Sequence, residues 1–230
     1  NLALLRGQLA FKPSDRFNVR ALFEYTRDRS NPSFNILLRR ADPTRPTAVE
    51  LPGYAFPRND IKNLTFYVNE PNERDVVDYR GTLIASLDLS DTATLTSTTG
   101  YIKHDIKLTN VDVDLTPVPT SKFELIGLYA EQFTQEFTLT AKLTERADLV
   151  AGLFYMHGNS SEPLYLTFGA LVNYLVYLPA EKLDSYAGYA QFRYNLTDKL
   201  RATIGGRYTI DKKSYTMDAN AAGVIRFLSS

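Results

Sequence analysis

The feature that most constrains the fold is a pattern of two alternating strands around a short polar turn, which occurs four times along the 230 residues. In residues 17–26, for example, the odd positions are apolar and the even positions are mostly polar, the period of a strand with one buried face. Each turn carries Ser or Thr with Asp or Glu, whose side chains hydrogen-bond to turn backbone. The sequence therefore predicts eight antiparallel, up-and-down strands in four hairpins: about residues 2–26, 79–103, 133–157 and 186–210.

The lengths of the predicted strands and loops favour a transmembrane β-barrel. Each strand has about 10 residues, which is what a tilted strand needs to cross a bilayer. The connections 29–76, 105–131 and 158–184 are predicted to be long loops, which are uncommon in compact soluble domains. Short turns at one end and long loops at the other are typical of outer-membrane barrels. All eleven prolines are expected in turns or loops, because proline cannot donate to a strand ladder.

The composition excludes several classes of function. The 26 basic and 26 acidic side chains give zero formal net charge, which argues against nucleic-acid binding, and the lack of Cys removes disulfides and thiolate chemistry. The sequence has no nucleophile–base spacing, so it predicts neither an enzyme nor a cofactor. It also has no run of 18 apolar residues that would predict a transmembrane helix, but a membrane β-barrel gives a much weaker hydropathy signal.

The two faces of the strands distinguish a soluble barrel from a membrane barrel. A soluble barrel buries its apolar face inside, whereas an outer-membrane barrel turns that face to lipid and keeps polar groups in the lumen. Charged residues alternate with apolar rows on essentially every predicted strand, which favours the membrane barrel. Tyrosines near the loop ends fit an interfacial aromatic girdle, although tyrosine is also a good strand former: Tyr79, Tyr101, Tyr155, Tyr186 and Tyr208.

Four stretches of sequence resemble hairpins of TonB-dependent outer-membrane receptors. The strongest is residues 186–200 followed by 205–209, which is similar to the family pattern "YA-F-Q--Y-LTD-L … GGRYT". The matches lie in family order and cover about residues 5–215, with the long loops left out. The other three are residues 5–16, residues 96–101, and residues 135–140 with 149–155, where Leu149 stands at a position that is commonly Trp.

The resemblance implies a fold and a function that reach beyond this sequence. Such receptors have an N-terminal plug domain inside a 22-stranded barrel and a segment that engages TonB. They import scarce nutrients such as ferric siderophores, cobalamin or oligosaccharides, driven by the inner-membrane proton gradient. No segment here resembles the plug or the TonB-engaging segment, so we expect a middle third of the barrel wall, cut from a longer chain. The implied partners are TonB through the absent plug segment, a nutrient ligand, and outer-membrane lipid with lipopolysaccharide. The implied location is the bacterial outer membrane, with turns in the periplasm and long loops outside the cell.

Three other functions stay open at this point. A passive porin-type channel would need an inward-folded constriction loop and no plug. A closed eight-stranded barrel with a structural or adhesive role would pair its first strand with its eighth. A soluble ligand carrier would turn its apolar rows inward.

Two groups of residues have the chemistry of metal ligands. His104 and His157, the only histidines, lie where predicted strands emerge into long loops, but without a paired carboxylate spacing they more often decorate a rim. Asp112 and Asp114, near Asn110, have the oxygen ligands of a calcium loop but lack its glycine and distal glutamate. The sequence therefore predicts no metal site.

The candidate ligand contacts lie in the predicted long loops. Arg39, Arg40 and Arg45 make the first loop basic, which would steer an anionic ferric chelate or bind lipopolysaccharide phosphates, or would simply be a solvated surface. Tyr165 and Tyr174 would stack on a ring-bearing ligand, but residues 165–178 are also apolar enough to extend a strand above the membrane, which is the favoured interpretation.

Overall fold

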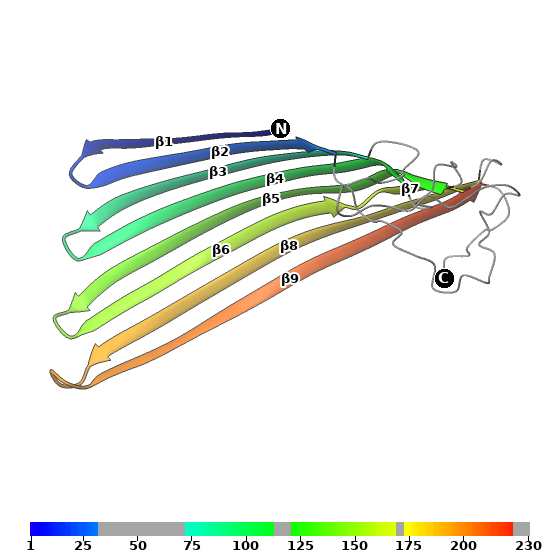
Figure 1. The fold of residues 1–230 in the computed structure, drawn as a ribbon. Helices are drawn as coiled ribbons and strands as arrows, with labels where there is room; N and C mark the ends of the chain where they lie inside the picture. Colours follow the sequence, from blue (N-terminus) through cyan, green and yellow to red (C-terminus); the bar gives the residue numbers. More distant parts are fainter. Residues whose placement is uncertain (32–71, 113–120, 169–172, 223–230) are drawn as a thin grey trace, which may run out of the picture.

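The computed structural model describes residues 1–31, 72–112, 121–168 and 173–222, and these residues form one antiparallel sheet (Figure 1). Neighbouring strands in the sequence are neighbours in space, as in an up-and-down barrel wall. No helix in this part of the chain is long and apolar enough to cross a membrane. The strands are β1 (Leu2–Ser14), β2 (Phe17–Ser30), β3 (Glu73–Ser90), β4 (Ala93–Asp112), β5 (Ser121–Thr144), β6 (Ala147–Ser161), β7 (Leu164–Phe168), β8 (Asn173–Asn195) and β9 (Arg201–Ala222).

The nine strands follow eight continuous paths, because β7 prolongs β6. Both pair with β5 in the same direction, β6 from Thr144 to Tyr129 and β7 from Ile126 to Ser121. The path is interrupted at Glu162 and Pro163, since Pro163 has no N–H for the ladder. The eight expected antiparallel strands are therefore present, one of them broken in two.

Tight turns close four hairpins at one end of the sheet, here called the turn end, and the opposite end is the loop end (Figure 1). The polar turn residues act as the sequence predicts. The Ser90 hydroxyl accepts the Thr92 N–H at 3.2 Å, and the Thr144 hydroxyl accepts the Arg146 N–H at 3.2 Å. The Thr197 hydroxyl accepts the N–H of Leu200 at 3.0 Å. These contacts satisfy turn backbone that has no strand partner.

The strands extend much further toward the loop end than predicted. The expected loop 105–131 is mostly strand, since β4 runs to Asp112 and pairs with β5 down to Lys122. The expected loop 158–184 is likewise the upper part of β6, the short β7 and the first half of β8. The sequence predicts strands of about ten residues, the length that crosses a bilayer. Strand pairing continues beyond that length wherever the neighbouring strand also continues. The favoured interpretation of residues 165–178 as a strand extension agrees with the pairing of β7 and β8.

Two prolines correct the expectation that every proline avoids strands. Pro13 lies near the end of β1, where the pairing register shifts between Phe11 and Ser14 and a proline is tolerated. The second is Pro179. It lies inside β8, opposite Met217 of β9. Its other side faces the break between β6 and β7, where its carbonyl accepts the Glu162 N–H at 3.2 Å. A proline is tolerated there because the missing N–H faces the interruption rather than a regular ladder.

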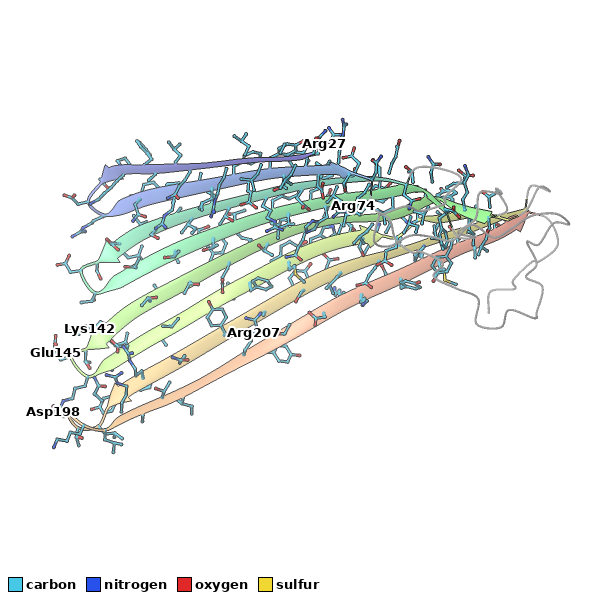
Figure 2. The ribbon with its side chains drawn as sticks, in the orientation of Figure 1. Arg27, Arg74, Lys142, Glu145, Asp198 and Arg207 are labelled. Carbon is cyan, nitrogen blue, oxygen red and sulfur yellow. The ribbon has the colours of Figure 1, made fainter. Side chains whose placement is uncertain are left out.

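Side chains stand on both sides of this single-layered sheet (Figure 2). The pairing register places Phe23, Leu83, Phe137, Leu153 and Tyr208 on one side, here called the apolar face. These side chains are uncovered: Leu153 is 66% exposed and Tyr208 is 74% exposed. The other side, the polar face, carries Arg20, Glu24, Thr96, Glu136 and Gln191.

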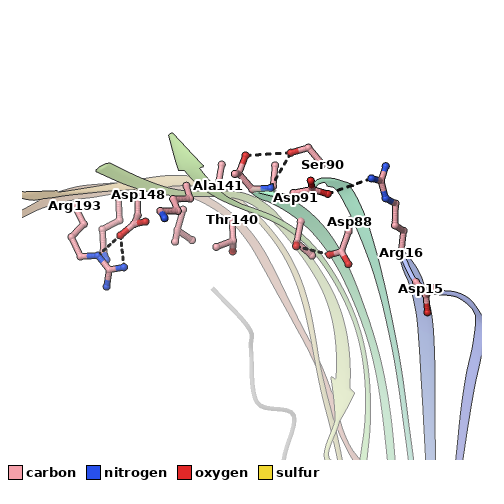
Figure 3. Close-up of a pocket in the computed structure, with 15 residues that line it drawn as sticks. Asp15, Arg16, Asp88, Ser90, Asp91, Thr140, Ala141, Asp148 and Arg193 are labelled. Atoms are coloured by element: carbon pink, nitrogen blue, oxygen red, sulfur yellow. Dashed lines mark hydrogen bonds and ion pairs between the residues drawn. The ribbon is translucent and has the colours of Figure 1, made fainter. Parts of the chain in front are cut away.

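The sheet curves around the polar face (Figure 3) and stays open. The apolar rows therefore face outward, which is opposite to the arrangement of a soluble ligand carrier. Among the described residues β1 pairs only with β2, and β9 pairs only with β8; Figure 1 shows them at opposite edges. A closed eight-stranded barrel is therefore wrong for these residues. The described sheet therefore has two open edges, one at β1 and one at β9.

Candidate functional site

Ion pairs gather on the polar face near the loop end. His104 of β4 contacts Asp78 of β3 through Nδ1, and Arg74 of β3 contacts Asp28 of β2. Across the sheet, the Lys213 Nζ lies 2.8 Å from a carboxylate oxygen of Glu181. Each of these contacts joins neighbouring strands, because the register brings a basic and an acidic residue onto the same face.

Between the first and the last of these pairs lies a cavity of about 250 Å³ in the barrel wall, here called the wall cavity. Its floor consists of small residues on β5 and β6, Ala130, Gly158 and Ser160. A Cβ on Gly158 would come no closer than 3.8 Å to another atom, so the space above it is open. Larger side chains from four strands form the rim: Ile102, His104, Gln132, Met156, Glu181 and Leu183.

The wall cavity combines polar and apolar groups on a concave surface. His104 donates through Nδ1 to Asp78 when neutral, so its Nε2 is left as an acceptor. Gln132 and Ser160 add donors and acceptors, and Glu181 is neutralised by Lys213. A cavity of this size can hold one fragment of a ligand rather than a whole drug-sized molecule.

A hydrogen-bonded cluster crosses the middle of the polar face. The Tyr189 hydroxyl donates to Glu136 at 2.7 Å and is 2.9 Å from the Thr138 hydroxyl, two strands away. The ring reaches over Gly152, whose added Cβ would lie 2.4 Å from the Tyr189 ring. The Arg207 guanidinium lies 5.8 Å from the centre of the same ring. The cluster therefore connects residues of β5, β6, β8 and β9 across the polar face.

The turn end of the polar face has a larger cavity of about 630 Å³ (Figure 3). Thr94 donates to Asp88 at 2.7 Å, Arg16 lies 3.3 Å from Asp91, and Arg193 donates to Asp148 at 2.8 Å. Every carboxylate in these contacts has a partner, so the cavity is polar without a large excess of either charge. The polar face is thus lined with hydrogen-bonding groups from the turn end to the loop end.

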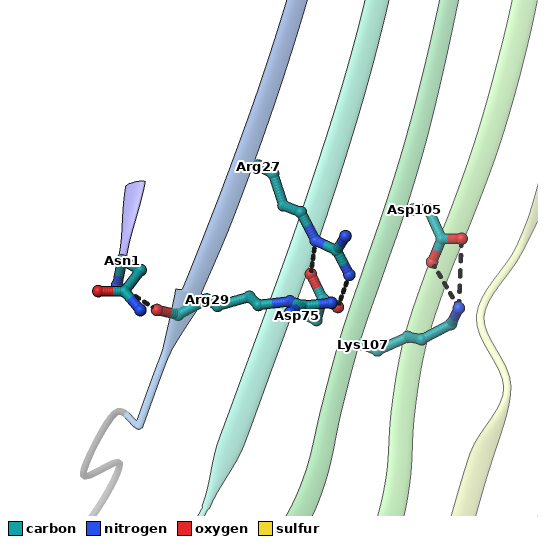
Figure 4. Close-up of polar contacts among 6 residues, drawn as sticks. All are labelled: Asn1, Arg27, Arg29, Asp75, Asp105 and Lys107. Atoms are coloured by element: carbon teal, nitrogen blue, oxygen red, sulfur yellow. Dashed lines mark hydrogen bonds and ion pairs between the residues drawn. The ribbon is translucent and has the colours of Figure 1, made fainter. Parts of the chain in front are cut away.

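The apolar face changes character near the loop end. Tyr25 and Tyr79 pack with ring centroids 5.1 Å apart, and Tyr155 and Tyr186 with centroids 5.0 Å apart, as in an aromatic girdle. Toward the loop end from these rings, each strand carries charged residues on the same face, and this set is here called the belt; part of it is drawn in Figure 4. Its members on this face are Arg27, Arg29, Asp75, Lys103, Asp105, Lys107, Glu131, His157, Lys182, Asp184 and Lys212.

Asp75 is the best-held carboxylate of the belt. It accepts two hydrogen bonds from Arg27, at 3.0 and 2.7 Å, and one from Arg29 at 3.3 Å (Figure 4). The hydrogen bonds from Arg27 hold the pKa of Asp75 below its ordinary 3.8, against the opposing effect of desolvation. The bidentate geometry explains why this pair orders β2 against β3 just above the Tyr25–Tyr79 contact.

This lowered pKa predicts how the contact depends on pH. A carboxylate whose folded-state pKa is depressed stabilises the fold above its unfolded pKa, and that contribution is lost as pH falls through the folded value. The loss of unfolding free energy caused by Asp75→Asn is therefore expected to be similar at pH 7 and pH 5 and to shrink below pH 3.8. The side chains are about one-third exposed, so the effect should stay near or below about 1 kcal/mol. Chemical unfolding of the full-length protein checks this, and a loss that stays unchanged at pH 3 would contradict it.

The two histidines lie on opposite faces of the sheet. His104 pairs in register with Ala130 on the polar face, whereas His157 pairs with Phe133 on the apolar face. They therefore cannot share a metal ion. Neither histidine has a carboxylate at a metal-ligand spacing in the sequence, but neighbouring strands supply one partner to each: His104 contacts Asp78, and His157 Nδ1 lies 2.8 Å from Asp184. No group of three or more metal-ligating side chains occurs in the part of the chain that the structure describes.

Most of the ligand contacts predicted from the sequence lie either outside the described residues or away from the wall cavity. Arg39, Arg40 and Arg45 lie outside the described residues, as does Asp114. Tyr165 lies in β7 and is 37% exposed; it pairs with Leu125, so it belongs to the same side as the belt and not to the wall cavity. Tyr174 lies in β8 and pairs with Thr167 of β7, but its side chain is outside the described part.

The wall cavity was not found from the sequence. Its residues come from four strands and are far apart in the chain, so only the pairing register brings His104 opposite Ala130 and Ser160 opposite Glu181. One signal was present: small residues at positions 130, 158 and 160 occur where longer side chains alternate around them. Without the register, that signal is indistinguishable from ordinary variation.

The curved sheet, its uncovered apolar face and its polar concave face define the wall of an outer-membrane type β-barrel. The TonB dependent receptor-like, beta-barrel family matches residues 7–227. The protein therefore belongs to the TonB-dependent receptor family, whose barrels are outer-membrane proteins that act as receptors and transporters rather than enzymes.

A solved structure of low sequence identity shares the fold. The chain is similar to the ferric yersiniabactin uptake receptor FyuA from Yersinia pestis, with a TM-score of 0.66 and 12% identity over 96% of this chain and 33% of that chain. It also matches the siderophore receptor PiuA from Acinetobacter baumannii, with a TM-score of 0.46 and 15% identity over 93% of this chain and 39% of that chain. The chain thus spans about a third of the length of FyuA. Among curated proteins none matches.

Proposed function

We propose that this chain is part of the wall of a TonB-dependent receptor that actively imports a scarce nutrient, of which a ferric siderophore is the leading candidate. In this proposal a plug domain and a TonB-engaging segment lie elsewhere in the protein. The turn end lies in the periplasm and the loop end outside the cell. The apolar face contacts outer-membrane lipid and lipopolysaccharide.

The observation that carries the proposal is the continuous polar lining of the concave face, with the wall cavity at its loop end. A ligand that enters from outside meets His104, Gln132 and Glu181 before it reaches the Tyr189–Glu136 cluster. This order supports recognition first and passage afterwards. In the same proposal Arg39, Arg40 and Arg45 steer an anionic chelate toward the mouth, while Tyr165 and Tyr174 are the less favoured ligand contacts.

Uptake of radioactive iron tests this function directly. Cells that express the full-length receptor are offered iron complexed by hydroxamate, catecholate or carboxylate siderophores, with cells lacking the gene as control. We expect at least one complex to be taken up only by the expressing cells. Uptake should also stop in a strain without TonB and after addition of a proton uncoupler.

The same assay separates the alternatives. Uptake that is insensitive to the uncoupler and to loss of TonB would indicate a passive porin-type channel and overturn active import. If none of the iron complexes is imported, the same cells are tested with cobalamin and an oligosaccharide. TonB-dependent uptake of one of these would replace the siderophore as the cargo and keep the mechanism.

A further inference from the structure

One row of the belt differs from the rest in its pattern of partners. Lys103, Glu131, Asn159 and Lys182 are successive register partners on β4, β5, β6 and β8. Three inter-strand spacings of about 4.8 Å put the two lysine backbones roughly 14 Å apart. A cavity of about 490 Å³ opens over this row and is lined by all four residues. The row is here called the lysine row.

The carboxylates of the belt have ionic or hydrogen-bonding partners, whereas the two lysines of the lysine row have no ionic partner among the described residues. Asp75 is held by Arg27, Asp105 lies 3.3 Å from Lys107, and Asp184 contacts His157. Glu131 accepts a hydrogen bond from the Tyr101 hydroxyl at 3.4 Å. Within the described residues, Lys103 and Lys182 form no ion pair with any carboxylate. Two cations at the rim of a cavity therefore have charge to offer an external anion.

Asn159 adds an unsatisfied acceptor to the same row. Its Nδ2 lies 3.0 Å from His157 Nε2, whose ring is oriented by Asp184 through Nδ1. Its Oδ1 is buried and has no hydrogen-bond partner. Buried polar atoms without a partner are rare in native proteins, because leaving such an atom unpaired costs free energy that a bound donor recovers. An acceptor between two lysines calls for a ligand that carries a hydroxyl or N–H beside its anionic groups.

The row next to the lysine row on its turn side holds Phe133 together with the paired His157 and Asp184, and beyond that row the surface is apolar. The rings of Phe133 and Tyr155, with centroids 6.4 Å apart, lie on the same face. Below them a cavity of about 450 Å³ runs over Gly188, lined by apolar side chains that include Phe137, Leu153, Tyr186, Tyr208 and Ile210. A molecule seated on the row thus has water-facing cations at one end and a hydrocarbon groove at the other.

We propose that the lysine row binds the phosphorylated sugar headgroup of a membrane glycolipid, with phosphates at Lys103 and Lys182 and a headgroup hydroxyl or amide N–H at Asn159. The acyl chains lie along the Gly188 groove. Lysines just outside a bilayer attract anionic headgroups, and aromatic side chains fix the depth of the interface. The inference rests on the membrane orientation in the proposed function but not on the identity of any imported ligand.

Binding of diphosphorylated lipid A to the purified full-length receptor tests this site. The double variant Lys103→Gln/Lys182→Gln is expected to bind it about thirtyfold more weakly, since each lysine near a lipid phosphate is worth about 1 kcal/mol. The control is Arg20→Gln, which removes a cation from the polar face at a position that lines neither the wall cavity nor the cavity over the lysine row, and it should leave the affinity unchanged. Asn159→Asp should weaken binding as well, because it places a negative charge between the phosphates.

Two further binding measurements identify which part of the lipid the site recognises. Lipid A without phosphates should bind weakly to the unaltered receptor, and inorganic phosphate alone should not compete at millimolar concentration. Competition by inorganic phosphate would indicate a free-anion site instead. An unchanged affinity in the double variant, with normal folding on a heat-modifiability gel, would overturn the proposal. Because binding is measured without uptake, failure of the import function would not affect this result.

Discussion

Leu153→Arg is expected to destabilise the full-length barrel by about 2–4 kcal/mol, which is the cost of arginine at the lipid midplane of a barrel. Leu153 is 66% exposed and lies about midway along the membrane-length part of β6, between Phe137 and Gly188 in register. A leucine this exposed would be unfavourable in water. In a membrane the same side chain contacts lipid acyl chains, which are as apolar as leucine itself. The guanidinium has neither water nor a carboxylate on this row, so its desolvation is uncompensated.

The matched control is Thr98→Arg, at a similar depth on the polar face. Thr98 pairs with Glu136, so the new guanidinium faces a carboxylate and the lumen. We expect a change within about 0.5 kcal/mol, as for ordinary surface substitutions. Urea unfolding of the receptor in lipid vesicles measures both variants. Equal losses in the two variants would show that the apolar face is not in contact with lipid, and would contradict the assignment of the two faces.

The alternation of apolar and polar residues was enough to predict which side chains share a face. In β2, Phe17–Ser30, the period of two holds from Phe17 to Tyr25. The structure puts the odd-numbered residues of this range on the apolar face, as the pattern requires. Turn chemistry was equally local, because Thr144 and Thr197 satisfy backbone only two or three residues away. Features that depend on residues close in sequence can therefore be predicted from the sequence.

Features that depend on register were not predictable from the sequence alone. The contact between His157 and Asp184 joins residues 27 positions apart, and a slip of one residue would place them on opposite faces. The upper ends of β4 and β5 were missed for a related reason. Above the membrane, residues such as Asp105 and Lys107 have no lipid to select apolar partners, so the strands continue with a polar pattern that resembles a loop.

Gly152→Val is expected to cost about 1–3 kcal/mol, because it displaces the Tyr189 ring from the middle of the polar face. An added Cβ would lie 2.4 Å from the ring carbon that bears the hydroxyl, which is impossible without movement. Tyr189 must then give up its hydrogen bonds with Glu136 and Thr138, and a part-buried carboxylate loses its donor. The preference of strands for β-branched residues would act in the opposite direction and is smaller.

A double-mutant cycle isolates this cause. With Tyr189→Ala the ring is gone, so Gly152→Val should become neutral or slightly stabilising, and the coupling energy should equal most of the loss in the single variant. Gly81→Val is the matched control, since nothing lies within 4 Å of its added Cβ. It should raise the unfolding free energy slightly, because valine suits a strand facing lipid. If Gly152→Val were as costly without the Tyr189 ring as with it, the loss would come from the backbone of β6, and the hydrogen-bonded cluster would have no part in holding the wall together.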